Sequence, residues 1–236
     1  MLINLKTLHG TRLAALDGDI GQVKDFYFDD QRWVIRYLVA DTGTWLTGKR
    51  VLLTPHVFGR IEERDGKVML INLTRQQIEN CPSPEAHQPV SRQYEVEYYK
   101  YYGWPAYWTG GAMWGFGSYP LTSPPARVDS AAQQPYHNRE DAHLRSALAL
   151  NGYHIQTTDG PIGQVSSLLV DDRSWAVRKL IVEAGHWYAG KEILIAPSKV
   201  QRISYEESTV FVSLTKEDIQ QAPEAKAVAG GPESPR

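Results

Sequence analysis

A seven-residue segment occurs twice in the 236-residue chain, and this internal repeat limits the fold more than any other feature. Residues 17–23 read DGDIGQV, and residues 159–165 read DGPIGQV, a displacement of 142 (17 to 159). The same displacement relates Trp33 to Trp175 and Arg36 to Arg178. A duplication of this kind predicts two homologous structural units.

Each copy is expected to consist of short β-strands. In the first copy, five runs are rich in β-branched and aromatic residues and are separated by Gly, Asp and Pro. These runs cover 20–28, 33–41, 49–54, 59–63 and 68–72. Strands that are so short and evenly spaced predict a mainly β fold, with a small barrel or sandwich in each copy.

A short helix is expected to close each copy. Thr74 and Gln77 have the spacing of a capping box, and Pro82 follows the helix. Thr215, Asp218 and Pro223 repeat this arrangement, with a displacement that is one residue shorter. Hairpin turns absorb length changes that strands do not, so the lost residue is placed in the turn at 64–67.

The repeats predict four segments. Repeat 1 covers 1–82, and repeat 2 covers 145–223. The connector between them, 83–144, holds a dense aromatic cluster followed by a Pro/Ser/Ala/Gln-rich stretch. The final segment, 224–236, is rich in Ala, Gly, Pro and Glu and is expected to be a disordered tail.

Three motifs together resemble the PRC-barrel domain. They are Asp17-Gly18-x-Ile20-Gly21-x-Val23, the run from Trp33 to Lys49, and the run from Leu73 to Pro82. This module is shared by the cytoplasmic part of the photosynthetic reaction-centre H subunit and the C-terminal domain of the ribosome-maturation factor RimM. The resemblance covers both repeats and implies two small β-barrels that contact proteins and carry no active site. It extends to stand-alone proteins with two such barrels, since the H subunit's membrane helix and RimM's partner domain have no counterpart here.

Composition limits the class of protein. The 25 basic and 27 acidic residues leave a formal charge of −2, which disfavours a strongly basic nucleic-acid binder. The single cysteine, Cys81, permits neither an intrachain disulfide nor a cysteine-based zinc site, and it fits a reducing compartment. The sequence has no apolar run of about 18 residues and no secretion-signal core. We therefore expect a cytoplasmic protein with no transmembrane segment, and peripheral association with the inner membrane is the variant that the H-subunit resemblance suggests.

Repeated charged residues are the first candidates for chemistry. Asp29-Asp30 and Asp171-Asp172 are interpreted as solvated turns rather than metal ligands, because no loop brings several oxygens together. Asp17 and Asp159 precede glycines in equivalent turns and are assigned a structural role. Arg36 and Arg178 are expected to form ion pairs inside the barrels, with the acids at the matching positions Asp41 and Glu183; the alternative is an arginine that binds a partner.

Other patterns also fail to indicate catalysis. The seven histidines lack metal-ligand spacing, and Cys81 matches Ala222, which favours a packing role. The sequence has no Gly-x-Ser-x-Gly motif, and Gly115-Phe116-Gly117 lacks the third glycine of a dinucleotide loop. We expect no enzyme, no cofactor and no bound metal.

The aromatic connector leaves four interpretations open. It covers one or both barrels and fills the groove between them; or it presents a surface to a protein partner; or it stacks on single-stranded nucleic acid; or it inserts into a membrane surface. The first is preferred, because barrels of about 80 residues benefit from a cover. The candidate interaction surface comprises Tyr98, Tyr99, Tyr102, Trp104, Trp108 and Trp114.

The expected function is that of a non-enzymatic module for protein binding or assembly, peripheral to a membrane complex of photosynthesis or electron transport. The alternative is a ribosome-maturation or RNA-processing accessory that contacts a ribosomal protein without direct nucleic-acid binding. The two barrels are expected to pair pseudo-symmetrically, with a homo-oligomer as a further option. Trp33 and Trp175 are each expected in the core of their own barrel.

Overall fold

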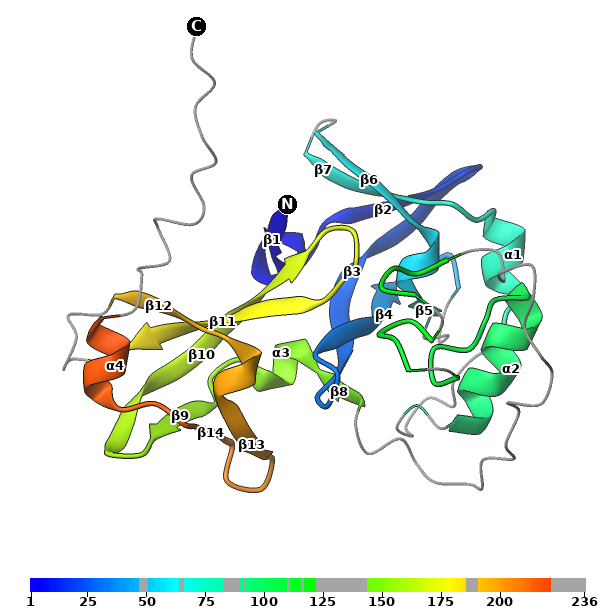
Figure 1. Cartoon of the computed structure of the whole chain (residues 1–236). Coiled ribbons are helices and arrows are strands. Elements are labelled where there is room, and N and C mark those ends of the chain that lie inside the picture. The colour runs from blue at the N-terminus through cyan, green and yellow to red at the C-terminus, as the bar shows by residue number, and fades with distance from the viewer. Residues whose placement is uncertain are drawn as a thin grey trace, which may run out of the picture. The chain divides into compact units, whose positions relative to one another are not determined.

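The computed structural model of the chain describes residues 1–46, 51–63, 66–82, 90, 92–109, 111–115, 117–121, 144–185 and 191–221. It is mainly β, as predicted, and its strands form two seven-stranded sheets (Figure 1). The predicted tail lies outside the described residues, as does most of the Pro/Ser-rich stretch.

The chain divides into two compact units, which we name after the repeat that supplies most of each sheet. The first-repeat unit contains Thr7–Ser146 and Arg173–Trp175. The second-repeat unit contains Met1–Lys6, Ala147–Asp172 and Ala176–Arg236. Both units therefore include residues from the two repeats.

The sheet of the first-repeat unit has the strand order β5-β4-β3-β2-β7-β6, with β8 paired to β3. Strands β3 to β7 correspond to the five predicted runs, with residues 49 and 50 outside the described chain. Buried Phe28, Ile35 and Leu38 lie in its core. The elements of this unit are β2 (Arg12–Ala15), β3 (Gly18–Asp29), β4 (Val34–Asp41), β5 (Val51–Leu53), η2 (Pro55–Val57), β6 (Phe58–Glu63), β7 (Lys67–Ile71), α1 (Arg75–Glu79), α2 (Arg92–Tyr102) and β8 (Leu144–Ser146). The short helix η1 (Leu5–Leu8) has two residues in each unit.

The sheet of the second-repeat unit repeats this topology. Its order is β12-β11-β10-β9-β14-β13, with β1 paired to β10, and its core includes Ile155, Leu180 and Val182. The elements are β1 (Leu2–Asn4), α3 (Ala147–Leu150), β9 (His154–Thr157), β10 (Gly160–Asp171), β11 (Val177–Ala184), β12 (Glu192–Ile195), η5 (Pro197–Lys199), β13 (Val200–Ser204), β14 (Thr209–Val212) and α4 (Lys216–Gln220).

Each sheet includes one strand from the start of the other repeat. β1 lies at the start of repeat 1 yet pairs antiparallel with β10 of repeat 2, with Leu2 opposite Asp171. β8 lies at the start of repeat 2 yet pairs antiparallel with β3 of repeat 1, with Leu144 opposite Asp29. Both partners are shifted by 142 residues (2 to 144, 29 to 171), so the exchange is the same in the two sheets.

The second glycine of the repeated motif permits a close strand contact. Gly21 has a φ of 123°, and a Cβ atom at this position would overlap the backbone carbonyl oxygen of Asp41 on β4. A Cβ atom at Gly163 would overlap the carbonyl oxygen of Glu183 in the same way. A side chain at either position would force the two strands apart, which explains why both copies have glycine.

The two short helices begin as predicted. The Thr74 hydroxyl oxygen accepts a hydrogen bond from the Gln77 amide, and the Gln77 side chain accepts one from the Thr74 amide. Thr215 and Asp218 form the same capping box before α4. These contacts satisfy amides that the first helical turn leaves free.

The aspartates of the repeated turns complete this arrangement. Asp17 Oδ1 accepts a hydrogen bond from the amide of Arg75 at 2.7 Å, and Asp159 Oδ1 accepts one from the amide of Lys216 at 3.0 Å. The Thr157 hydroxyl and the Lys216 amide, which both donate to Asp159, lower the pKa of its carboxyl group. The structural interpretation of both aspartates is confirmed.

Candidate functional site

The described part of the aromatic connector, residues 92–109 and 111–115, packs on the first sheet beside β4 and β5 (Figure 1). Tyr94, Tyr98 and Tyr99 lie on one face of α2, and all three are buried. The Tyr98 hydroxyl donates a hydrogen bond to the carbonyl oxygen of Leu52, 2.8 Å away on the edge strand β5. The preferred interpretation, that the connector is a cover, therefore holds for the first sheet.

The six residues of the candidate interaction surface do not share one environment. Tyr98, Tyr99 and Trp114 are only 0%, 2% and 3% exposed, respectively. Tyr102, Trp104 and Trp108 are half-buried. Tyr98, Tyr99 and Trp114 were predicted at the surface but are buried, because the apolar face of α2 and the turns after it pack on the sheet.

His56 lies at the centre of these aromatic rings. Its imidazole is stacked on Trp104, with ring centroids 5.2 Å apart, and it meets Tyr99 and Trp114 edge-on. The Thr54 hydroxyl lies 3.0 Å from His56 Nδ1. Burial lowers the pKa of His56 to about 3, and the nearby charge of Arg36 acts in the same direction. His56 is therefore a neutral packing residue at physiological pH.

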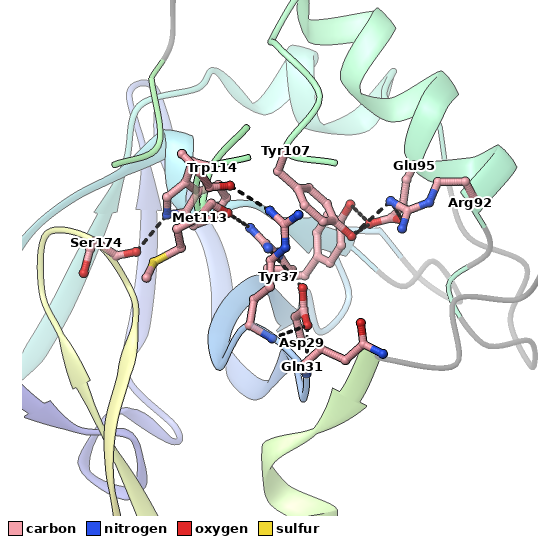
Figure 2. A network of polar contacts seen from close by, with 12 residues as sticks. Asp29, Gln31, Tyr37, Arg92, Glu95, Tyr107, Met113, Trp114 and Ser174 are labelled. Atoms are coloured by element: carbon pink, nitrogen blue, oxygen red, sulfur yellow. Dashed lines mark hydrogen bonds and ion pairs between the residues drawn. The ribbon is translucent and has the colours of Figure 1, made fainter. Parts of the chain in front are cut away.

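Glu95 binds α2 to the sheet through polar contacts (Figure 2). Its fully buried carboxylate accepts hydrogen bonds from the hydroxyls of Tyr37 on β4, at 2.7 Å, and Tyr107, at 2.8 Å. Arg92 Nη1 lies 2.7 Å from the other carboxylate oxygen. Burial and the charge of Glu95 raise the pKa of Tyr37, so its hydroxyl stays protonated and can donate.

Arg36 is buried between the sheet and the connector residues Tyr107 and Met113. Its guanidinium is fully buried, forms an ion pair with Asp29 at 3.0 Å and donates to the carbonyl oxygen of Met113 at 2.8 Å. It also lies 3.7 Å from the ring centroid of Tyr107. The predicted ion pair of Arg36 inside the unit is therefore present, but its partner is Asp29 and not the predicted Asp41, which is exposed. The register of β3 against β4 shifts between Tyr27 and Phe28, which leaves Arg36 at a bulge beside the end of β3.

The acidic turn after β3 is a turn, as interpreted, although its first residue is not solvated. Asp29 Oδ1 accepts hydrogen bonds from the amides of Gln31 and Arg32, and Asp29 is buried. Its other oxygen pairs with Arg36. The carboxylate thus holds both the turn and the buried cation.

The corresponding face of the second sheet is different. Arg178 and Glu183 are exposed, and among the described residues no ion pair joins them, so the prediction is wrong here. At the positions of Tyr37, Thr54 and His56, this repeat has half-buried Lys179, half-buried Ala196 and exposed Ser198. We call Arg178, Lys179, Ala196 and Ser198 the open face. These substitutions were visible in the aligned repeats, and they are the signal that sequence reasoning missed.

The turn between β10 and β11 belongs to the first-repeat unit. Trp175, in a left-handed conformation with a φ of 56°, packs on Phe58 and Phe26 with ring centroids 4.7 and 6.1 Å apart. The carbonyl oxygen of Trp175 accepts a hydrogen bond from the amide of Ile35. The carbonyl oxygen of Ser174 accepts one from Trp114 Nε1 (Figure 2). Trp175 was expected in the core of its own repeat; instead it is part of the core of the other repeat's unit.

A pH titration tests the assignment of His56. The unfolded state takes up a proton near pH 6.5 that the folded state excludes down to about pH 3, so acid favours unfolding. As the pH falls from about 6.5 to about 3, the free energy of unfolding of the native protein should decrease more steeply than that of the variant His56→Phe. The difference in slope should be up to about 1.4 kcal/mol per pH unit. Urea unfolding at several pH values measures this difference. The exposed-histidine control His154→Phe should keep the native slope, and a native slope in His56→Phe would refute the assignment.

No group of three or more potential metal ligands is found among the described residues, and none of their helices is long and apolar enough to span a membrane. Comparison with models of known protein families gives no match for the chain, and a search of curated proteins gives none.

Proposed function

We propose that the protein is a non-enzymatic binding module made of two PRC-type barrels, which assembles with a protein partner at the periphery of a membrane complex. The resemblance of both repeats to the PRC-barrel domain supports this proposal. The residues that carry the resemblance serve the fold, since Gly21 and Gly163 allow strand contact and Asp17 and Asp159 bind helix amides.

The difference between the two sheet faces carries the proposal. Beneath the connector, Arg36, Tyr37 and His56 are buried, and their polar atoms bind Asp29, Glu95 and Thr54. At the equivalent positions, the open face presents Arg178 and Ser198 to solvent. The first repeat thus binds a segment of its own chain on the surface that the second repeat leaves available for a partner.

The charge of the open face also favours a second candidate. Arg178 and Lys179 carry two adjacent positive charges, while the neighbouring acids Glu183 and Glu192 lie opposite each other at the far ends of β11 and β12. A ribosome-maturation accessory that contacts an acidic patch of a ribosomal protein would use the same surface. The two candidates differ in the partner rather than in the residues that bind it.

A pull-down from the native cell separates the candidates. The tagged full chain is used as bait, soluble and membrane fractions are kept apart, and captured proteins are identified by mass spectrometry. Recovery of subunits of one membrane complex is the expected result. Recovery of ribosomal proteins from the soluble fraction would replace the first candidate with the second. Turnover of a substrate by the purified chain would overturn both.

A further inference from the structure

The edge of β3 forms a built slot for a strand. Tyr27–Asp29 pair with Leu144–Ser146, and two side-chain contacts fix the register. The Ser146 hydroxyl donates to Asp25 Oδ2 at 2.6 Å, and Arg145 Nε lies 3.3 Å from Asp30 Oδ2. The strand that fills this slot comes from beyond the connector.

The edge of β10 forms the equivalent slot. Asn4 occupies the place of Ser146, and Ser167 occupies the place of Asp25, each shifted by 142 residues (4 to 146, 25 to 167). The hydrogen bond between these two positions is kept with its direction reversed, since the Ser167 hydroxyl donates to Asn4 Oδ1 at 2.6 Å. Both slots therefore select their strand by side-chain chemistry as well as by backbone pairing.

In both slots, a strand from one side of residues 122–143 pairs with a strand from the other side. The first-repeat unit contains Thr7–Ser146, in which β8 follows the 22 residues 122–143 (143 minus 121). A connection of this length spans at most about 75 Å when extended. Residues 144–146 and 173–175, on its far side, complete the first-repeat unit, and residues 1–6 complete the second-repeat unit.

We propose that a second copy of this chain can fill both slots. Residues 1–121 of one molecule would combine with residues 144–236 of another, and the reciprocal halves would do the same. The exchanged dimer makes every strand contact of the monomer, because the same residues meet in both. This inference goes beyond the proposed function and does not depend on the identity of its partner.

The balance between the two forms follows from concentration. Two segments that belong to one chain meet at an effective concentration of roughly millimolar when a short stretch of residues joins them. Exchange should therefore be rare when the protein refolds at about 1 μM, and it should become appreciable when refolding occurs near 1 mM. Direct mixing of folded monomers should give slow exchange, since both slots must open first.

Two cysteine variants report exchange directly. One full chain carries Tyr27→Cys and the other carries Ser146→Cys, at directly opposed positions of β3 and β8, and both carry Cys81→Ala. The two chains are unfolded, mixed, refolded at about 1 mM and oxidised. A disulfide-linked heterodimer is expected, at least five-fold more abundant than after refolding at about 1 μM.

Two controls make the result decisive. A single chain with both Tyr27→Cys and Ser146→Cys should form an internal disulfide, which shows that the slot geometry permits the bond. A mixture of Ser146→Cys with Glu63→Cys, exposed at the end of β6, measures random coupling. Heterodimer at the level of the random control would overturn the proposal. Failure of the single-chain disulfide would also overturn it, because the pairing of β3 with β8 would then be absent.

Discussion

Replacement of Trp175 by alanine is expected to lower the free energy of unfolding of the first-repeat unit by about 3–5 kcal/mol. The side chain is only 4% exposed and packs on Phe26 and Phe58, which belong to the other repeat. Its removal leaves a cavity beside β4, whose Ile35 amide donates to the carbonyl oxygen of Trp175. The largest loss should therefore appear in a sheet more than 100 residues distant in sequence.

The matched control is Trp33→Ala, at the equivalent position of the first repeat. Trp33 has nearly the same φ, 52°, but its side chain is half-buried, so a smaller loss is expected. Urea unfolding gives the two free energies, and hydrogen exchange at the Ile35 amide locates the effect. An equal loss in both variants, or protection of Ile35 unchanged in Trp175→Ala, would contradict the assignment.

Replacement of Glu95 by alanine is expected to destabilise the same unit by about 3–5 kcal/mol. The change removes the acceptor of the Tyr37 and Tyr107 hydroxyls and leaves the charge of Arg92 without its buried counter-ion. Buried donors without acceptors carry a large desolvation cost. Calorimetry or urea unfolding measures the loss.

The control for Glu95 lies two residues away on the same helix. Glu97 is exposed, so Glu97→Ala has the same change in charge and helix propensity but should alter stability by no more than about 0.5 kcal/mol. A loss of similar size in the two variants would show that α2 is not anchored through Glu95.

The strands with long apolar runs could be predicted from the sequence. The strands β1 and β8, which each join the sheet of the other repeat, could not. β3 and β4 have alternating or continuous apolar residues that identify them locally. β1 and β8 are three residues long, and their nearest paired residues lie 165 (Asn4 to Leu169) and 115 (Asp29 to Leu144) residues away. Nothing local in Leu2–Asn4 indicates which sheet edge the strand joins.

The candidate site was missed for a related reason. The two repeats were treated as equivalent, so Arg36 and Arg178 were assigned the same environment. The connector breaks this equivalence, because it supplies Glu95 and Tyr107 to one sheet only among the described residues. The replacement of Tyr37 by Lys179 and of His56 by Ser198 reflects the same difference.

The most direct test of the account compares capture of the partner by two charge-reversal variants. The variant Arg178→Glu with Lys179→Glu changes the open face, and Arg60→Glu with Lys100→Glu makes the same change in charge at exposed positions of the first-repeat unit. Both are used as bait beside the native chain, with equal folding checked by circular dichroism. If the open face binds the partner, the open-face variant should capture at least ten-fold less of it, and the other variant should capture as much as the native chain. Equal capture by both variants would contradict it.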